Sequence, residues 1–179
     1  GNSKEAINYY IKAIKINPHN ALTYNNLGNA LKDVKDYKRA IQAFSDCIKR
    51  DPKNFNAYNN LGLIFQKRGK NIKAKNYYKK VIQIEPNFIM AQYNLGLVFR
   101  QLGESKKSIE CYTKVIQINP AIVDAHNNLG LVYADLGRYK EAVNCYLEAL
   151  KHDINHKKAK QNLISILTYY RSDKKNLII

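Results

Sequence analysis

The chain has 179 residues, of which 45% are hydrophobic and 25% are charged, so it has enough apolar side chains to build a folded core. No apolar run approaches the roughly 18 residues of a membrane span, and no signal peptide opens the chain. Lysine and arginine exceed aspartate and glutamate by 30 to 14, a formal net charge of +16. An anionic partner would explain this excess, and so would A+T-rich codon usage, which favours lysine and asparagine.

Residue types recur every 34 positions along the chain. Two independent sets follow this spacing: Gly28, Gly62, Gly96 and Gly130, and Pro18, Pro52, Pro86 and Pro120. A 34-residue period is typical of stacked helical hairpins. The sequence therefore predicts an all-α fold, with residues 1–179 forming a single solenoid that winds as a right-handed superhelix.

The chain is expected to start within a hairpin. Residues 1–20 align with the second half of a repeat, with a helix predicted at 4–16, so we expect the chain to be part of a longer protein or to be processed. The apolar stripe of this helix, Ile7, Tyr10, Ile11 and Ile14, has no first helix to pack against. Because such a stripe usually marks a contact surface, self-association through the N-terminal half repeat is expected.

Four complete repeats follow, each predicted to contain a first and a second helix. They are 21–54, 55–88, 89–122 and 123–156. The predicted helices are 21–34, 37–50, 55–68, 71–83, 89–102, 105–118, 123–136 and 139–151. The recurring glycine is the eighth residue of each repeat, and alanine or serine is the twentieth, so two helices can approach closely there. Gly69, Gly103 and Gly137 fall at the turn between the helices, where a positive φ is expected. A proline after each second helix ends it.

A capping helix is predicted at 157–171, at the start of a fifth repeat. Ile164 replaces the eighth-position glycine, so no closely packed second helix is expected after it. Residues 172–179 are interpreted as a tail, whose apolar end, Leu177–Ile179, has no assigned partner.

Leucine at the seventh position, glycine at the eighth and aromatic residues at the twenty-fourth make these repeats resemble the tetratricopeptide repeat (TPR) family over nearly the whole chain. The resemblance implies that the first helices line a concave groove, into which positions two, five, six, nine, twelve and thirteen point. It also implies a protein-binding scaffold and no enzymatic activity.

Asparagine occupies the sixth position of every repeat, although in the middle of a helix it costs up to about 0.7 kcal/mol relative to alanine. An amide offers both donors and an acceptor, which match the backbone of an extended peptide, and we expect these amides to be accessible. The predicted peptide-binding residues are Asn26, Asn60, Asn94, Asn128 and Asn162 at position six, Asn25, Asn59 and Asn127 at position five, and Tyr93, Leu63, Leu97 and Leu131 as apolar subsites. Two alternatives remain: the asparagines bridge neighbouring first helices, or they reflect codon usage.

The asparagine ladder resembles the groove of the TPR region of O-linked N-acetylglucosamine transferase, and residues 118–130 look especially similar to its repeats. The resemblance implies a binding mode only, because the transferase's catalytic domain has no counterpart here. The lysines and arginine that TPR carboxylate clamps use are absent, since position five is asparagine or tyrosine. Binding of the acidic C-terminal tails of chaperones is therefore not expected.

No catalytic, metal-binding or cofactor-binding set of residues is found in the sequence. Of the three cysteines, Cys111 and Cys145 occupy one repeat position, and with Cys47 they fit core positions in a reducing, intracellular and cytoplasmic setting.

The predicted function is a scaffold that holds an extended partner segment. One alternative is a basic module that recruits RNA or an anionic membrane through the outer face of the hairpins. A second alternative is the targeting region of a larger enzyme, such as a glycosyltransferase. The basic residues in question are Lys53, Lys67, Arg68, Lys70, Lys73, Lys75, Lys79 and Lys80, with a second cluster of Lys157, Lys158 and Lys160.

Overall fold

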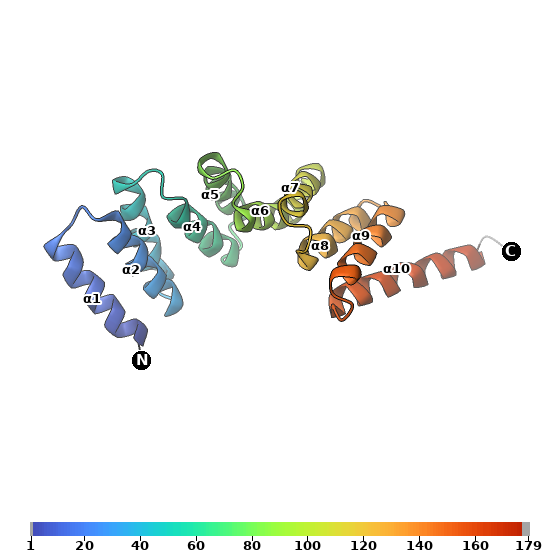
Figure 1. Cartoon of the computed structure of the whole chain (residues 1–179), viewed down its shortest axis with the longest axis horizontal. Coiled ribbons are helices and arrows are strands. Elements are labelled where there is room, and N and C mark those ends of the chain that lie inside the picture. The colour runs from blue at the N-terminus through green and yellow to red at the C-terminus, as the bar shows by residue number, and fades with distance from the viewer. Residues whose placement is uncertain (1, 177–179) are drawn as a thin grey trace. The chain divides into compact units, whose positions relative to one another are not determined.

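The predicted all-α fold is confirmed. The computed structural model describes residues 2–176, and within them it contains ten helices and no strand (Figure 1). The helices are α1 (Asn2–Ile16), α2 (Ala21–Asp33), α3 (Tyr37–Arg50), α4 (Phe55–Lys67), α5 (Asn71–Ile84), α6 (Ile89–Gln101), α7 (Ser105–Ile118), α8 (Val123–Asp135), α9 (Tyr139–His152) and α10 (Lys157–Asn176).

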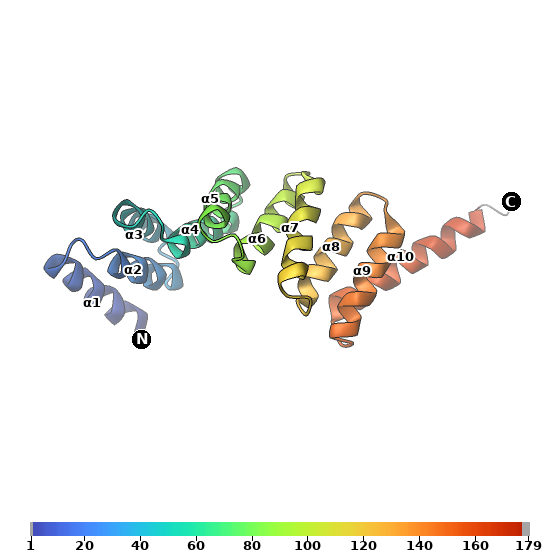
Figure 2. The same ribbon diagram turned by 45° about the horizontal axis from the view of Figure 1, so that its top comes forward.

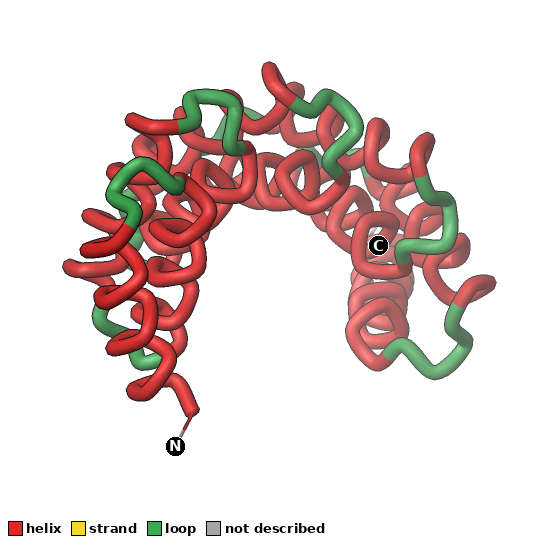
Figure 3. Tube along the Cα trace, turned by 60° about the vertical axis from the view of Figure 1, so that its left-hand side comes forward, coloured by secondary structure: helices red, strands yellow, loops and turns green. Residues whose placement is uncertain are grey.

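The chain forms two compact units, residues 1–94 and 95–179, which are described separately. In the first unit α2 packs against α1, its hairpin partner α3 and the next first helix α4, and α4 packs against α5. In the second unit α8 packs against α7, α9 and α10. Figures 2 and 3 show that within each unit the first helices form one layer and the second helices another. The single continuous solenoid and its superhelical winding stay predictions.

Local sequence signals explain where the helices begin. The side chains of Asn20, Asp36 and Asn54 accept hydrogen bonds from backbone N–H groups in the first turns of α2, α3 and α4. Nine helices match their predicted bounds to within two residues, and α10 continues five residues beyond its predicted end. The predicted apolar tail Leu177–Ile179 lies outside the described residues.

Each hairpin is packed around a glycine and an aromatic ring. A Cβ atom placed on the eighth-position glycine would lie 2.5–3.0 Å from a ring atom of the aromatic residue sixteen positions later. The four pairs are Gly28 with Phe44, Gly62 with Tyr78, Gly96 with Tyr112 and Gly130 with Tyr146. All four rings are at most 1% exposed. The two helices of each hairpin therefore approach closely at this point, as the small residue predicts.

Turn glycines adopt the predicted positive φ, at 68° for Gly69, 72° for Gly103 and 71° for Gly137. The first hairpin lacks this glycine, and there Lys35 adopts a φ of 63°. A side chain in the left-handed region costs about 1–2 kcal/mol. The first hairpin therefore contains strain that the other three avoid.

A Lys35→Gly variant should consequently be more stable than the natural chain. The relieved strain exceeds the extra entropy that glycine loses on folding, so we expect a gain of about 0.5–1 kcal/mol in the free energy of unfolding. Urea denaturation followed by circular dichroism would measure it. A loss of stability would show that the Lys35 side chain makes a contribution larger than its backbone strain.

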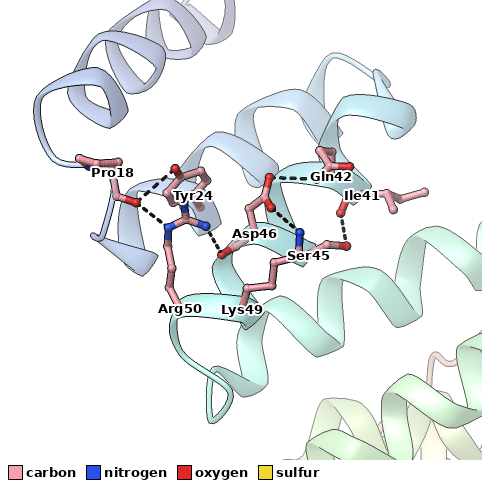
Figure 4. Close-up of polar contacts among 8 residues, drawn as sticks. All are labelled: Pro18, Tyr24, Ile41, Gln42, Ser45, Asp46, Lys49 and Arg50. Carbon is pink, nitrogen blue, oxygen red and sulfur yellow. Dashed lines mark hydrogen bonds and ion pairs between the residues drawn. The ribbon is translucent and has the colours of Figure 1, made fainter.

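In the first and fourth repeats the loop before the hairpin is held by the fourth residue of that hairpin, as Figure 4 shows for the first. In the first repeat the carbonyl of Pro18 accepts hydrogen bonds from the Tyr24 hydroxyl and from Nε of Arg50. The Arg50 guanidinium also lies 3.9 Å from the centroid of the Tyr24 ring. In the fourth repeat His126 takes the same part, with Nε2 at 2.8 Å from the carbonyl oxygen of Pro120. Different side chains thus fix the same junction between repeats.

The last helix covers the core of the hairpin before it. Ile166 of α10 is 8% exposed and joins a cluster with Ala142 and Tyr146 of α9. On another side of α10, Ile164 is 61% exposed and Leu167 is 48% exposed. Within the described residues no second helix packs on this apolar side of α10.

Candidate functional site

Each unit has a candidate site, its first-helix face, which we define as positions two, five, six, nine, twelve and thirteen of its first helices. These helices are α2, α4 and the start of α6 in the first unit, and the rest of α6, α8 and the matching positions of α10 in the second. The position-six asparagines are more buried than expected: Asn60, Asn94 and Asn128 are 9%, 7% and 9% exposed. Asn26 and Asn162 are half-buried. The prediction of accessible amides is therefore wrong for the three middle residues, because their neighbours close over them.

In the first unit one of these amides is bonded to the adjacent first helix. Nζ of Lys32, at the end of α2, donates to Oδ1 of Asn60 on α4 at 2.7 Å. Nζ also lies 3.3 Å from Oδ1 of Asn29. Burial is the main reason that the pKa of Lys32 is lowered. The bond joins two consecutive repeats, which is the bridging role left open by the sequence.

Bridging is also present in the second unit. Nδ2 of Asn162 on α10 donates to Oδ1 of Asn127 on α8 at 2.9 Å, and Asn127 is only 2% exposed. Arg100 forms a two-pronged ion pair with Asp135, with Nε–Oδ2 at 2.6 Å and Nη2–Oδ1 at 3.3 Å. This hydrogen-bonded pairing raises the pKa of Arg100. In this unit, therefore, neighbouring first helices are joined by an ion pair between positions twelve and thirteen and by a hydrogen bond between positions five and six.

Three buried amide atoms have no hydrogen-bond partner in the described part of the chain: Oδ1 of Asn25, Oδ1 of Asn59 and Nδ2 of Asn94. A buried polar atom without a partner costs about 1–3 kcal/mol. The first unit therefore contains both acceptor and donor atoms that a peptide backbone could satisfy if it displaced the side chains around them.

Apolar side chains also reach this face. Leu63, Leu97 and Leu131, and also Tyr93, are half-buried, and their role as subsites stays a prediction. More exposed are Leu22 at 61% and Met90 at 55%, both at position two. Leu22 and Met90 were not predicted from the sequence, because position two changes its residue type from repeat to repeat.

Two hollows are present in the first unit. One, of about 340 Å³, lies between α1 and α2. It is lined by Ser3, Ala6, Tyr10, Asn26, Asn29, Ala30 and Asp33. The other, of about 480 Å³, is lined by Tyr58 of α4 and by Asn76, Tyr77, Lys79, Lys80 and Gln83 of α5. Lys79 and Lys80, which are exposed, thus border the second hollow and not the first-helix face.

Histidine, cysteine, aspartate and glutamate are the side chains that most often carry catalysis or bind metals. Among the residues with described positions, no three histidine, cysteine, aspartate or glutamate side chains lie together as metal ligands. Burial raises the pKa of Cys47 and of Cys145 to about 11, so both are thiols near neutral pH. The ring centroids of His126 and His152 lie 5.6 Å apart in a stacked pair, which the sequence did not predict.

No helix within residues 2–176 is long and apolar enough to cross a membrane.

Comparisons with known families identify the repeat. The family model described as tetratricopeptide repeat matches residues 21–54, 55–88 and 123–156. A further model, described as TPR repeat, matches 1–35 and 96–137. A search of curated proteins found no match.

Solved structures give the same result for the fold. A crystal structure of MamA is similar with a TM-score of 0.82 and 32% identity, over 89% of this chain and 92% of that one. MamA from Desulfovibrio magneticus RS-1 has a TM-score of 0.80 at 23% identity, over 87% of this chain and 88% of that one. YrrB, described as a TPR protein with an unusual peptide-binding site, has a TM-score of 0.80 at 23% identity, over 90% and 84% of the two chains. The resemblance to the repeats of the glycosyltransferase stays a prediction.

Proposed function

We propose, from the premise that the chain belongs to the tetratricopeptide repeat family, that it is a non-enzymatic protein-interaction scaffold whose first-helix faces bind an extended segment of a partner protein. Stacked hairpins of this kind expose long surfaces suited to holding other chains. YrrB, a protein of the same fold, is described as having a peptide-binding site. An intracellular, cytoplasmic location remains part of this proposal.

The observation that carries the proposal is the exposure of apolar side chains on the first-helix face of the first unit. Leu22 and Met90 are both more than half exposed, and Leu63 of α4 is half-buried. Exposed apolar side chains that recur on one face favour contact with another protein. The unpaired amide oxygens of Asn25 and Asn59 lie on the same face and would accept hydrogen bonds from a peptide backbone.

The other predicted residues take part in two ways. Asn26, Tyr93, Leu97 and Leu131 are proposed to contact the partner directly, whereas Asn94 and Asn128 are buried and are proposed to do so only after the side chains around them are displaced. Asn60, Asn127 and Asn162 already bond neighbouring first helices, so we propose that they contact the partner only after these bonds are exchanged. Such exchange makes binding sensitive to the spacing of the helices.

A second candidate function is recruitment of RNA or an anionic membrane by the outer face. The hollow beside Lys79 and Lys80 favours it, because it combines two amines with the rings of Tyr58 and Tyr77. Phosphate contacts weaken steeply with salt, whereas apolar and backbone contacts do not. The two candidates therefore differ in how binding responds to ionic strength.

We expect that a double variant, Leu22→Asp with Met90→Asp, weakens binding of peptides selected from a random-sequence library at least tenfold. Both residues are exposed and lie in the first turns of α2 and α6, where a carboxylate is favourable, so the melting temperature should hardly change. Ile72→Asp is the matched control, because Ile72 is 56% exposed and lies in the first turn of the second helix α5.

Fluorescence anisotropy with the selected peptides, at about 0.1 and 0.5 M salt, measures the effect. Binding should survive the higher salt and be unchanged in the Ile72→Asp control. Loss of binding at high salt, or in a Lys79→Glu, Lys80→Glu variant but not in the double variant, would contradict the proposal and favour the outer face.

A further inference from the structure

The fourth residue of a repeat carries a ring in three of the four repeats, and in two of these a planar side chain lies against the ring. In the first repeat the Arg50 guanidinium lies 3.9 Å from the centroid of the Tyr24 ring (Figure 4). In the fourth repeat the His152 and His126 rings are stacked, with their centroids 5.6 Å apart. Both covering side chains occupy position thirty of their repeat. A planar group against this ring is therefore a recurring feature of the chain.

The second repeat has the ring but not the planar side chain. Its position-four residue is Tyr58, and its position-thirty residue is Ile84. Tyr58 borders the hollow of about 480 Å³, as does Lys80 at position twenty-six. In the first repeat the position-twenty-six carbonyl, that of Asp46, accepts a hydrogen bond from the Arg50 guanidinium. The hollow thus lies beside the two residues whose counterparts hold a planar cation in the first repeat.

The charge around the hollow is the reverse of the charge in the first repeat. There the Asp46 carboxylate at position twenty-six accepts a hydrogen bond from Lys49 at 3.1 Å. In the second repeat this aspartate is replaced by lysine, and Lys79 and Lys80 are both exposed at the hollow. From residue 52 to residue 84 the sequence contains no acidic residue. The hollow therefore favours a negatively charged ligand, where the first repeat provides a carboxylate of its own.

The remaining groups at the hollow suit a nucleotide. The Tyr77 ring is stacked on Phe65, with 5.4 Å between the centroids and 3° between the planes, so its position is fixed. Asn76 and Gln83 border the hollow from one stripe of α5, and both are exposed. Their amides can donate and accept hydrogen bonds, which the edge of a base and a 2′-hydroxyl both require.

We propose that this hollow binds a nucleotide of single-stranded RNA, with the base against the Tyr58 ring and the phosphate beside Lys79 and Lys80. Proteins that bind single strands combine aromatic stacking with a basic surface along the backbone. In a duplex the bases are paired and stacked on one another, and a lipid head group has no planar group for the ring. The inference rests on the second candidate function, whose ligand it identifies, and no residue of the hollow belongs to a first-helix face.

Fluorescence anisotropy with the full chain and a labelled single strand of RNA, about ten nucleotides long, tests the ligand. A strand of the same length without bases should bind at least tenfold more weakly, because it keeps the phosphates but cannot stack. Equal binding of the two strands would overturn the proposal, since charge alone would explain it. Tighter binding to phosphatidylserine vesicles, or to DNA of the same sequence, would overturn it in favour of a membrane or of DNA.

A variant that adds a positive charge separates stacking from charge. Ile84→Arg places at position thirty the side chain that covers Tyr24 in the first repeat, so it should weaken RNA binding at least fivefold although it raises the net charge. Ile118→Arg is the matched control, because Ile118 is also half-buried at position thirty, but its repeat has Gln92 at position four. The control should bind RNA at least as tightly as the natural chain. Tighter binding by Ile84→Arg would show that no base lies on the ring.

Two lysine variants test the phosphate contacts on exposed side chains, where the fold should be retained. Lys79→Gln with Lys80→Gln should weaken RNA binding at least fivefold and reduce the slope of log affinity against log salt by about 1.4, roughly 0.7 for each phosphate contact. Lys157→Gln with Lys158→Gln removes the same charge from the second basic cluster and should change neither quantity. Equal losses in both variants would overturn the proposal. The peptides selected for the first-helix faces should bind both variants unchanged, so the scaffold function is tested separately.

Discussion

A Gly130→Val variant should lose about 3 kcal/mol or more of unfolding free energy, because valine adds atoms where the core has no room and is a poor helix former. A Cβ atom at Gly130 would lie 2.5 Å from the Tyr146 ring, which is 1% exposed and cannot move aside. Urea denaturation of the full chain, followed by circular dichroism, measures the loss.

Alanine at two glycines of the same unit provides the matched comparison. At Gly96 the nearest ring atom would be 3.0 Å from the new Cβ, so the strain is smaller. Alanine also gains about 1 kcal/mol in helix propensity over glycine. Gly96→Ala should therefore be close to neutral, whereas Gly130→Ala should be clearly destabilising. Equal stabilities of the two variants would contradict the view that the ring contact requires glycine.

Raising the pH from 8 to about 11 should strongly destabilise the fold. Burial raises the pKa of Cys47 from its ordinary value of 9.0 to about 11, and that of Tyr146 from 10.0 to about 12. The pKa of Tyr78 is raised as well, also by burial. Above pH 9 the unfolded chain therefore releases protons that the folded chain retains. Stability is complete below pH 9 and falls as the pH rises toward 12.

For Cys47, which is fully buried, a shift of this size corresponds to roughly 2–3 kcal/mol. Urea midpoints at pH 8 and 10.5 test the prediction, and a Cys47→Ala variant should show a smaller fall between the two pH values. Identical midpoints for the natural chain would mean that these groups ionise without unfolding, and would refute the assignment.

The sequence was sufficient to predict the helices and the hairpin packing, because both depend on residues close together in the chain. The glycines at the turns have a positive φ, and those beside the aromatic rings allow a close approach of two helices, and glycine meets both demands at the lowest cost. Lys35 shows the limit of this reasoning, because its positive φ comes from the geometry of the repeat and not from its own residue type.

The exposure of the asparagines at positions five and six could not be predicted from the sequence in the same way. Their exposure depends on how closely neighbouring first helices approach, and that spacing is set by side chains about 28 to 35 residues apart, such as Lys32 with Asn60 and Asn127 with Asn162. The period predicts which residues face the groove, but it contains no information on the width of the gap between helices. The amides therefore lie on the predicted helix face, but several are buried in bridges.

The side-chain hydrogen bonds described between different helices join residues 12 to 35 positions apart, as in Ser108 with the carbonyl of Gly96 and Arg100 with Asp135. Because these bonds join residues that are close in the sequence, a 34-residue segment can be gained or lost in evolution while the remaining residues keep equivalent neighbours. The same property makes loop closure inexpensive in entropy, so this chain should fold quickly for its length.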